Sequence, residues 1–259
     1  MENFADFIIE YIENKPIQGT KGWLNQLNTY EWNRDTYPKM VSITREFWKK
    51  STEILNTPDN NTLWHDHCKR IRKWGHMPRP ISLSEGRAYK NCVLSLNKED
   101  PDIISALTKC PACKLKRIAM ATKIYYFSNP LKWTIYDSRV GFALDQLIFE
   151  YAKKREISPE SVFPNNEFCI PEAQTCGRNS VYGFGKCSYS KRKSLWSFIW
   201  TSHLHRMIAR KLNTMEKIEK PDYCLSEEKC WELPHIEMVF FMLGESQWVD
   251  VNDNVKGLI

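Results

Sequence analysis

Apolar residues recur every three to four positions along much of this chain, which is the spacing of one face of an α-helix. Strict alternation of apolar and polar residues, the pattern of a half-buried strand, is sparse. The pattern therefore predicts a mainly α-helical protein with irregular loops or minor β structure. In the first predicted helix, the apolar positions are Phe4, Phe7, Ile8, Tyr11 and Ile12.

Four further stretches show the helical spacing. They cover residues 41–55, 62–74, 195–212 and 236–243. Gly75 and Gly244 directly follow two of these stretches, and a glycine in that position commonly adopts the left-handed conformation that ends a helix. Turn-forming residues concentrate in 158–190, which predicts a loop excursion or a small β element there.

The most informative stretch, 117–144, reads RIAMATKIYYFSNPLKWTIYDSRVGFAL. Residues 114–127 contain neither Pro nor Gly and predict an amphipathic helix, which Pro130 cannot continue. The aromatic and β-branched run 133–136 favours an extended, buried connection. A second helix then begins after Asp137.

Asp137 stands at the N-cap position of that second helix. Its carboxylate is expected to accept the backbone amide of Arg139 or Val140, and a cap of this kind stabilises a protein by about 1 kcal/mol. A carboxylate at such a junction can instead act on a ligand held against it, so both interpretations stay open here. The apolar stripe of the helix consists of Val140, Leu144, Leu147 and Tyr151.

The segment ATKIYYFSNPLKWTIYDSRV resembles the catalytic segment of the helix-hairpin-helix DNA glycosylases. More narrowly, it is similar to the 8-oxoguanine DNA glycosylase-like proteins of bacterial anti-phage defence systems. Weaker similarity extends to KWGHMPRP and IEMVFFMLG. The resemblance implies a two-lobed fold, DNA as partner, and Asp137 as the carboxylate that faces the deoxyribose C1′ and stabilises positive charge there.

The chain departs from this family in two places. The family's hairpin has a glycine-rich turn that holds a DNA phosphate, whereas TKCPACKLKR has no glycine. Bifunctional members carry a nucleophilic lysine where Arg117 aligns, and a guanidinium stays protonated and cannot form a Schiff base. A shift of one residue places Lys116 there, and Lys123 lies on nearly the same helical face two turns further on. Lys116 is the predicted nucleophile, with Lys123 as the alternative.

Charge supports a nucleic-acid partner more by its placement than by its total. The chain has 37 Lys and Arg against 31 Asp and Glu, a net charge of +6. Two stretches, 103–136 and 173–215, contain no acidic residue. They are typical of a surface that contacts phosphates, although a solvated basic face is the plainer alternative. The predicted contacts are Arg117, Lys123, Arg139, Lys191, Arg192 and Lys193.

Nine cysteines are many for a chain with no secretory signal pattern. Cys110 and Cys113 have the spacing of half a zinc site, but no second pair with this spacing exists, so reduced and mostly buried thiols are favoured. His65 and His67 in WHDHC stand two positions apart and would point to different faces of a helix. The sequence therefore predicts no metal and no cofactor.

Length and composition fit a globular protein of one or two lobes, and the resemblance implies a single two-lobed unit. The 259 residues are 42% hydrophobic and contain no apolar run long enough for a membrane span, so a cytoplasmic protein is expected. Approximate lobes are 1–100, a hairpin and catalytic segment 101–157, and 158–259.

The resemblance implies excision of a modified or oxidised purine-like base from DNA, in anti-phage defence. Two alternatives remain open. The chain can be a recognition subunit that binds nucleic acid, a nucleotide or another defence protein without chemistry, or a glycosidase that acts on free nucleotides or RNA.

Overall fold

The computed structural model describes residues 1–16, 19–58, 60–97, 118–162, 168–169 and 191–256, with only the backbone described at 191 and 246–256. This part of the chain is mainly α-helical with minor β structure, as predicted, and its β structure is one two-strand hairpin. Its elements are α1 (Glu2–Asn14), α2 (Trp23–Asn28), β1 (Glu31–Trp32), β2 (Asp35–Thr36), α3 (Tyr37–Leu55), α4 (Asn61–Trp74), α5 (Leu83–Asn97), α7 (Ile118–Ser128), α8 (Ser138–Arg155), the 3₁₀ turn η2 (Pro159–Val162), α9 (Lys191–Thr214) and α10 (Leu233–Lys256).

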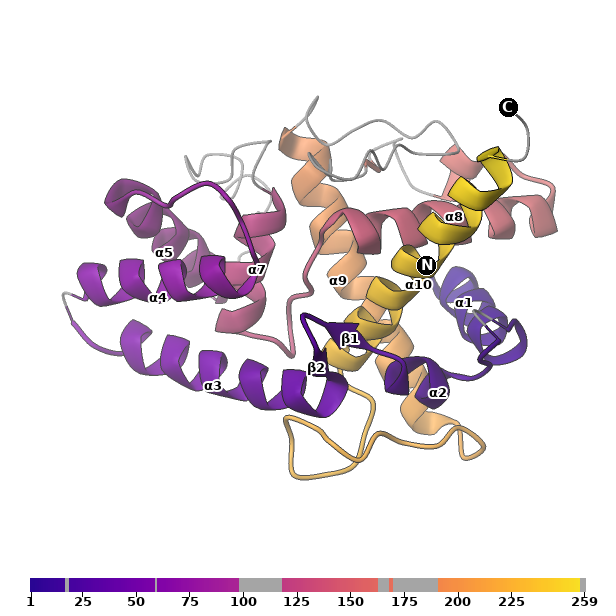
Figure 1. Ribbon diagram of the computed structural model, residues 1–259, viewed down its shortest axis with the longest axis horizontal. Helices are drawn as coiled ribbons and strands as arrows, with labels where there is room; N and C mark the ends of the chain where they lie inside the picture. Colours follow the sequence, from indigo (N-terminus) through magenta and orange to yellow (C-terminus); the bar gives the residue numbers. More distant parts are fainter. Residues whose placement is uncertain (17–18, 59, 98–117, 163–167, 170–190, 257–259) are drawn as a thin grey trace.

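The helices form two groups that meet at α7 and α8 (Figure 1). Helices α3, α4 and α5 pack on α7, while α2, α8 and α9 pack on α10 and α1 packs on α8 and α9. The first hundred residues thus contribute to both groups, because α1 and α2 pack with the C-terminal helices. The connection from α7 to α8 passes between the groups (Figure 1).

Helix α7 is buried on almost every side. Of its eleven residues only Ala119 is not fully buried, because α3, α4, α5 and α9 all pack against it. The sequence predicted an amphipathic helix, whereas the polar residues Thr122 and Lys123 are buried with the rest of α7. Their burial places polar side chains in the interior at the boundary between the two groups.

The connection and the start of α8 confirm the sequence prediction. Residues 133–136 are buried and form neither helix nor strand, and Asp137, with an extended backbone, is the N-cap of α8. The backbone N–H of Tyr136 donates to the Thr122 hydroxyl of α7 over 3.1 Å, and that of Thr134 donates to the Ser202 hydroxyl of α9 over 3.2 Å. The segment that leads into Asp137 is therefore anchored from both sides.

Of the two glycines predicted to end helices, Gly75 does so as the C-cap of α4, although without the left-handed conformation, whereas Gly244 does not. Gly75 has a right-handed φ of −77°, and His76 after it takes the left-handed φ of 50°. Gly244 lies inside α10, which continues to Lys256. A Cβ at Gly244 would lie 2.0 Å from the Arg139 carbonyl oxygen, so this glycine is needed for the close contact of α10 with α8 rather than for a helix end.

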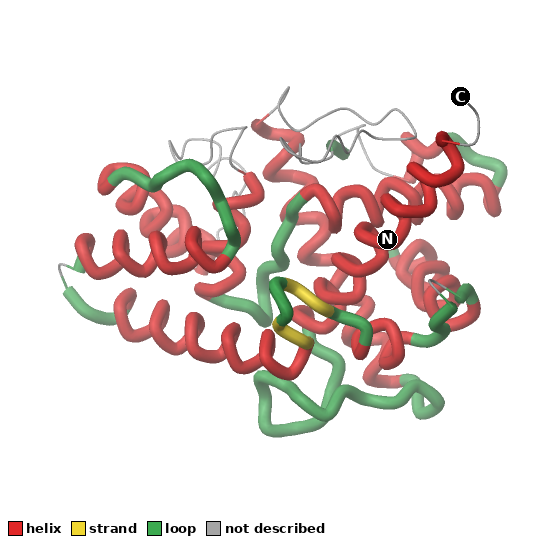
Figure 2. The backbone as a smooth tube through the Cα atoms, viewed as in Figure 1, coloured by secondary structure: helices red, strands yellow, loops and turns green. Residues whose placement is uncertain are grey.

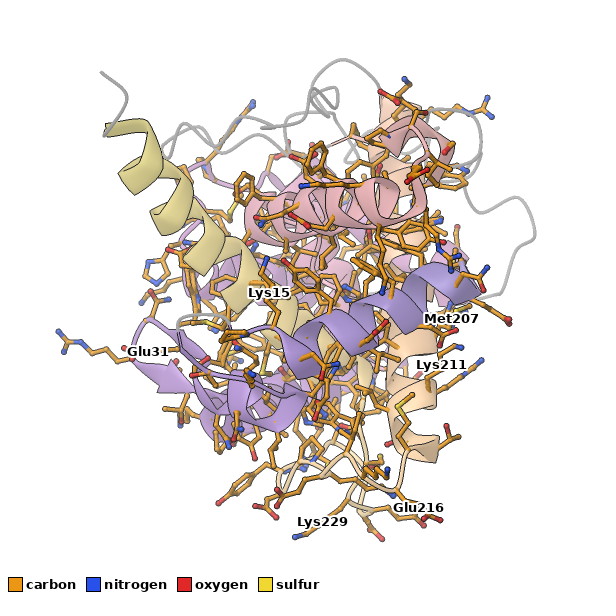
Figure 3. The ribbon with its side chains drawn as sticks, turned by 90° about the vertical axis from the view of Figure 1, so that its right-hand side faces the viewer. Lys15, Glu31, Met207, Lys211, Glu216 and Lys229 are labelled. Carbon is orange, nitrogen blue, oxygen red and sulfur yellow. The ribbon has the colours of Figure 1, made fainter. Side chains whose placement is uncertain are left out.

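The β1–β2 hairpin was not predicted from the sequence. Its strands have two residues each, too few for an alternating pattern to show, and the turn residues Asn33 and Arg34 have φ of 53° and 71° (Figure 2). Positive φ at both turn positions suits a tight two-residue hairpin. Figure 3 shows Glu31 on this hairpin, well away from Glu216 and Lys229 in the 215–232 loop.

No helix in the described ranges is long and apolar enough to cross a membrane. Cysteines 68, 169, 224 and 230 carry free thiols, as expected. Cys92 is disulfide-bonded, which contradicts the expectation of a reduced thiol at that position. The predicted half zinc site at Cys110 and Cys113 lies outside the described residues.

Candidate active site

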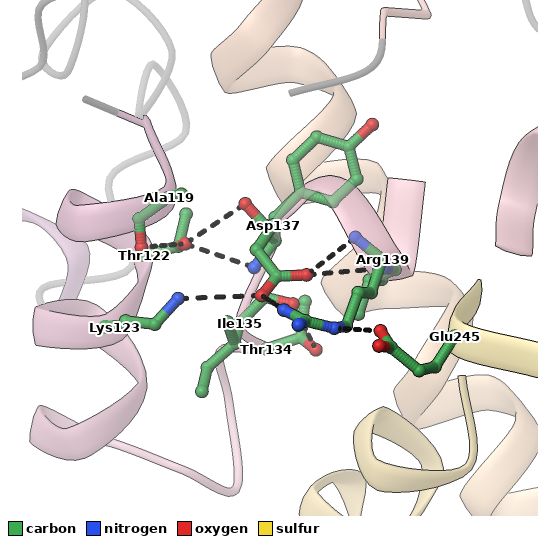
Figure 4. A network of polar contacts seen from close by, with 10 residues as sticks. Ala119, Thr122, Lys123, Thr134, Ile135, Asp137, Arg139 and Glu245 are labelled. Carbon is green, nitrogen blue, oxygen red and sulfur yellow. Dashed lines mark hydrogen bonds and ion pairs between the residues drawn. The ribbon is translucent and has the colours of Figure 1, made fainter. Parts of the chain in front are cut away.

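Asp137 lies where the two helix groups meet, at the N-terminus of α8. Its Oδ1 accepts the backbone N–H of Arg139 over 2.9 Å and that of Val140 over 3.3 Å (Figure 4). Both predicted cap bonds are therefore present. The cap occupies only one carboxylate oxygen, so Oδ2 remains available for other partners.

Lys123 reaches this second oxygen from α7. Its Nζ lies 3.7 Å from Asp137 Oδ2, and only 5% of the residue is exposed (Figure 4). Gly75 at the end of α4 makes room for the lysine, because a Cβ there would lie 2.9 Å from Lys123 Cδ. Lys123, predicted as a phosphate contact or as the alternative nucleophile, thus lies in the interior with its amine beside Asp137.

Arg139 lies on the other side of the carboxylate. Its Nη1 is 3.9 Å from Asp137 Oδ2, while its Nε donates to the carboxylate of Glu245 on α10. The guanidinium carbon lies 4.8 Å from the ring centre of Trp32 and 4.6 Å from that of Phe241. Arg139 is therefore held between two aromatic rings and two acids, and this arrangement ties α8 to α10 and the hairpin.

These neighbours keep Asp137 ionised. Burial by itself raises the pKa of a carboxyl, but the positive charges of Lys123 and Arg139 and the two backbone amides outweigh it, so the Asp137 pKa is lowered. The carboxylate is thus a fixed negative charge in a largely dry site. Such a charge interacts more strongly with a developing cation than the same group would in water.

Glu237 is a second acid at the site, and the sequence interpretation missed it. It lies on α10, only 4% exposed. Burial, followed by repulsion from Asp137, raises its pKa to about 8, although Lys123 opposes the shift. A polar residue among the apolar positions of 236–243 was the available signal, but the sequence does not indicate that α10 passes Asp137.

Asp137, Lys123 and Glu237 line one small pocket with aromatic walls. The open volume is about 10 Å³, close to the space of one water molecule. A flat ring would enter only after the walls move apart. The remaining lining residues are Tyr30, Trp32, Met40, Trp74, Ile135 and Phe241.

The other predicted contacts are not brought to this pocket. Lys116 and Arg117 lie outside the described residues, as does the glycine-free hairpin segment. Arg192 and Lys193 are exposed in the first turn of α9, whereas only the backbone of Lys191 is described.

The histidines of WHDHC point apart, as expected from their spacing. His67 Nε2 lies 2.8 Å from the Ser51 hydroxyl, whereas His65 Nε2 lies 2.9 Å from the carbonyl oxygen of Ile81. The two rings are therefore engaged with different parts of the chain.

Cys224, Glu232 and His235 form a buried cluster with metal-ligand chemistry. However, Glu232 accepts two backbone amides, and His235 Nδ1 accepts the Glu232 N–H over 3.0 Å while Nε2 donates to the Tyr223 carbonyl over 2.8 Å. The imidazole has no lone pair left for a metal, so this cluster serves the fold.

Comparisons of the chain with family models, with curated proteins and with solved structures found no match.

Proposed function

We propose that this protein is a DNA glycosylase-like enzyme that breaks the N-glycosidic bond of a modified or oxidised, purine-like base held beside Asp137. The observation that carries the proposal is the buried Asp137–Lys123 pair at the boundary of the two helix groups, next to an aromatic-walled pocket. The resemblance of the segment around Asp137 to the glycosylases supports the same reaction.

Asp137 supplies the electrostatic part of the reaction. As the base departs with the electron pair of the C1′–N bond, positive charge develops on the sugar. The lowered pKa of Asp137 keeps it negatively charged at neutral pH, and the α7–α8 connection holds it in place before the charge appears. A preorganised charge of this kind costs no rearrangement in the transition state.

Lys123 is the described lysine whose amine lies at this carboxylate. After losing a proton to solvent, its amine would bond to C1′, and opening of the sugar ring would give a Schiff base with O4′ taking up a proton. Capture of C1′ by water would instead give simple hydrolysis. The amine at Lys123 therefore supports a lyase activity that the aligned Arg117 cannot provide.

The pocket has to open to admit a base. Trp32 and Trp74, which are only partly buried, are the walls nearest to solvent, and every wall is apolar or aromatic apart from Lys123, Asp137 and Glu237. Aromatic faces stack on an extruded base without strong sequence preference. DNA is the proposed partner, with Arg192 and Lys193 as exposed candidates for phosphate contacts.

The small volume of the pocket supports a second candidate function. With an open volume of about 10 Å³, the same protein would act as a nucleic-acid recognition subunit of a defence complex if the walls never part.

Release of free base separates the two functions. Wild type and Asp137→Asn are incubated with phage DNA, unmodified DNA and 8-oxoguanine-containing duplex, and free bases are detected by mass spectrometry, with borohydride in parallel tubes. We expect release by the wild type, none by Asp137→Asn, and DNA affinity of the variant equal or higher. A borohydride-trapped adduct that disappears in Lys123→Arg identifies the nucleophile. Unchanged release by Asp137→Asn rejects the mechanism, and DNA binding without release by the wild type supports the recognition subunit.

A further inference from the structure

Two polar groups of the pocket have no hydrogen-bond partner among the described residues. The carboxyl group of Glu237 forms neither a hydrogen bond nor an ion pair with them, although it lies in the interior. The indole N–H of Trp74 is also buried and without a partner. Buried polar groups are nearly always paired, so the unpaired carboxyl of Glu237 at the pocket wall is available to a group that enters the pocket.

The charged and titratable groups around Glu237 come from three parts of the chain. Asp137 and Lys123 act on it from α8 and α7, and its charge in turn affects the hydroxyls of Tyr30 and Tyr126. Lys123 is already paired with Asp137, so it offsets the burial of Glu237 only in part. With a pKa of about 8, Glu237 carries a proton at neutral pH.

We propose that Glu237 is a further catalytic residue, the general acid that protonates the departing base, and that the pocket accepts neutral bases with a basic ring nitrogen. This proposal rests on the proposed glycosylase function. It gives the two acids of the pocket different tasks: Asp137 faces the sugar as an anion, while Glu237 faces the base as a proton donor. Two acids whose environments separate their protonation states are the usual form of such a division.

The step balances without a further reactant except water. The C1′–N bond breaks and its electron pair stays on the base. The Glu237 O–H bond breaks, and its proton bonds to a ring nitrogen of the base, so the base leaves neutral and Glu237 becomes a carboxylate. Water or the neutral Lys123 amine then bonds to C1′ and loses a proton to the solvent, and the solvent returns a proton to Glu237.

The test compares a base that needs a proton with one that does not. Glu237→Gln keeps the size and polarity of the side chain but has no acidic proton. A neutral substrate base identified with the wild type is compared with 7-methylguanine, which is already positively charged and leaves without protonation. Glu232→Gln is the matched control, because Glu232 is also buried and precedes the same helix but lies outside the pocket.

We expect Glu237→Gln to slow release of the neutral base by about 100-fold or more, the usual contribution of a general acid, and to change 7-methylguanine release little. The wild-type rate for the neutral base should fall as pH rises past about 8, while the variant rate should be flat there.

Equal losses on both bases, or an unchanged rate on the neutral base, would overturn the role of Glu237 while leaving glycosylase activity intact. If 7-methylguanine is not a wild-type substrate, the pH profile decides: a wild-type decline past pH 8 that persists in Glu237→Gln rejects the proposal. A wild type that releases no base from any DNA removes the proposed function, and this inference with it.

Discussion

Two buried acids five residues apart at the start of α10 have opposite environments. Glu232 accepts the backbone N–H groups of Leu225 and Ser226 over 2.7 and 2.8 Å, and His235 beside it has both ring nitrogens bonded. Glu237 has no hydrogen bond to a described residue and lies near Asp137 and Lys123.

The difference between Glu232 and Glu237 shows that a buried acid in this protein can have either of two roles. A buried acid whose oxygens are all bonded to the backbone fixes a loop, and its removal costs stability. A buried acid left unpaired beside another acid destabilises the fold, so its presence needs another explanation. The 215–232 loop and the pocket are therefore expected to respond oppositely to substitution, which the following variants measure.

Gly244→Ala should have the largest effect, because it breaks the contact that brings Glu237 to Asp137. The added Cβ would lie 2.0 Å from the Arg139 backbone oxygen, and neither helix backbone can yield cheaply. We expect a loss of more than about 3 kcal/mol in unfolding free energy, measured by denaturant titration. Gly19→Ala is the control. A Cβ at Gly19 would meet no other atom, and only its positive φ is unfavourable for alanine, so a loss near 1 kcal/mol in unfolding free energy is expected. Equal losses would show that α8 and α10 are less closely packed.

The second largest effect is expected in the pH dependence of the unfolding free energy. The folded-state pKa of Glu237 is raised from 4.5 to about 8, so the folded protein binds this proton more tightly than the unfolded chain does. Its contribution to the unfolding free energy is complete below about pH 4.5 and is lost as pH rises to 8, on the order of 5 kcal/mol.

Asp137 acts in a different window, because its pKa is lowered and its contribution is lost only as pH falls through that acidic value. Glu237→Gln should remove the loss of unfolding free energy above pH 4.5 and leave the loss at acidic pH that Asp137 causes. Unfolding free energies of both proteins from pH 2 to 9 cover both windows, and parallel curves above pH 4.5 would contradict the raised Glu237 pKa.

Glu232→Gln should have a smaller effect on stability alone. One of the two amide-accepting oxygens becomes an NH₂ group that cannot accept, so a part-buried backbone N–H loses its partner at about 1 kcal/mol. Thermal unfolding measures the loss. Base release per folded molecule should stay unchanged, and a specific loss of release would show that the 215–232 loop takes part in the reaction.

The residues next to Asp137 in the sequence were enough to predict its position at the start of α8. Asp137 follows an extended apolar run and precedes an apolar stripe, and its cap bonds to Arg139 and Val140 formed as expected. The end of a helix at Gly244 was predicted wrongly, because a glycine demanded by a neighbouring backbone looks the same in sequence as one that ends a helix.

Contacts between distant segments could not be predicted. Glu237 lies 100 positions after Asp137, and no periodicity indicates that α10 crosses the start of α8. The inward position of Lys123 depends on the space left by Gly75, a residue of α4. The sequence therefore indicated Asp137 and named Lys123 as a phosphate contact or alternative nucleophile, but it indicated neither Glu237 nor the position of the Lys123 amine beside Asp137.

Single-turnover base release by Asp137→Asn and Glu232→Gln, measured side by side below the unfolding temperature of each, tests the central claim most directly. Asparagine still caps α8, so the first variant should fold, bind DNA and release no base, while the second should be less stable and release base at the wild-type rate. Release by Asp137→Asn at the wild-type rate, or loss of release confined to Glu232→Gln, would contradict the account.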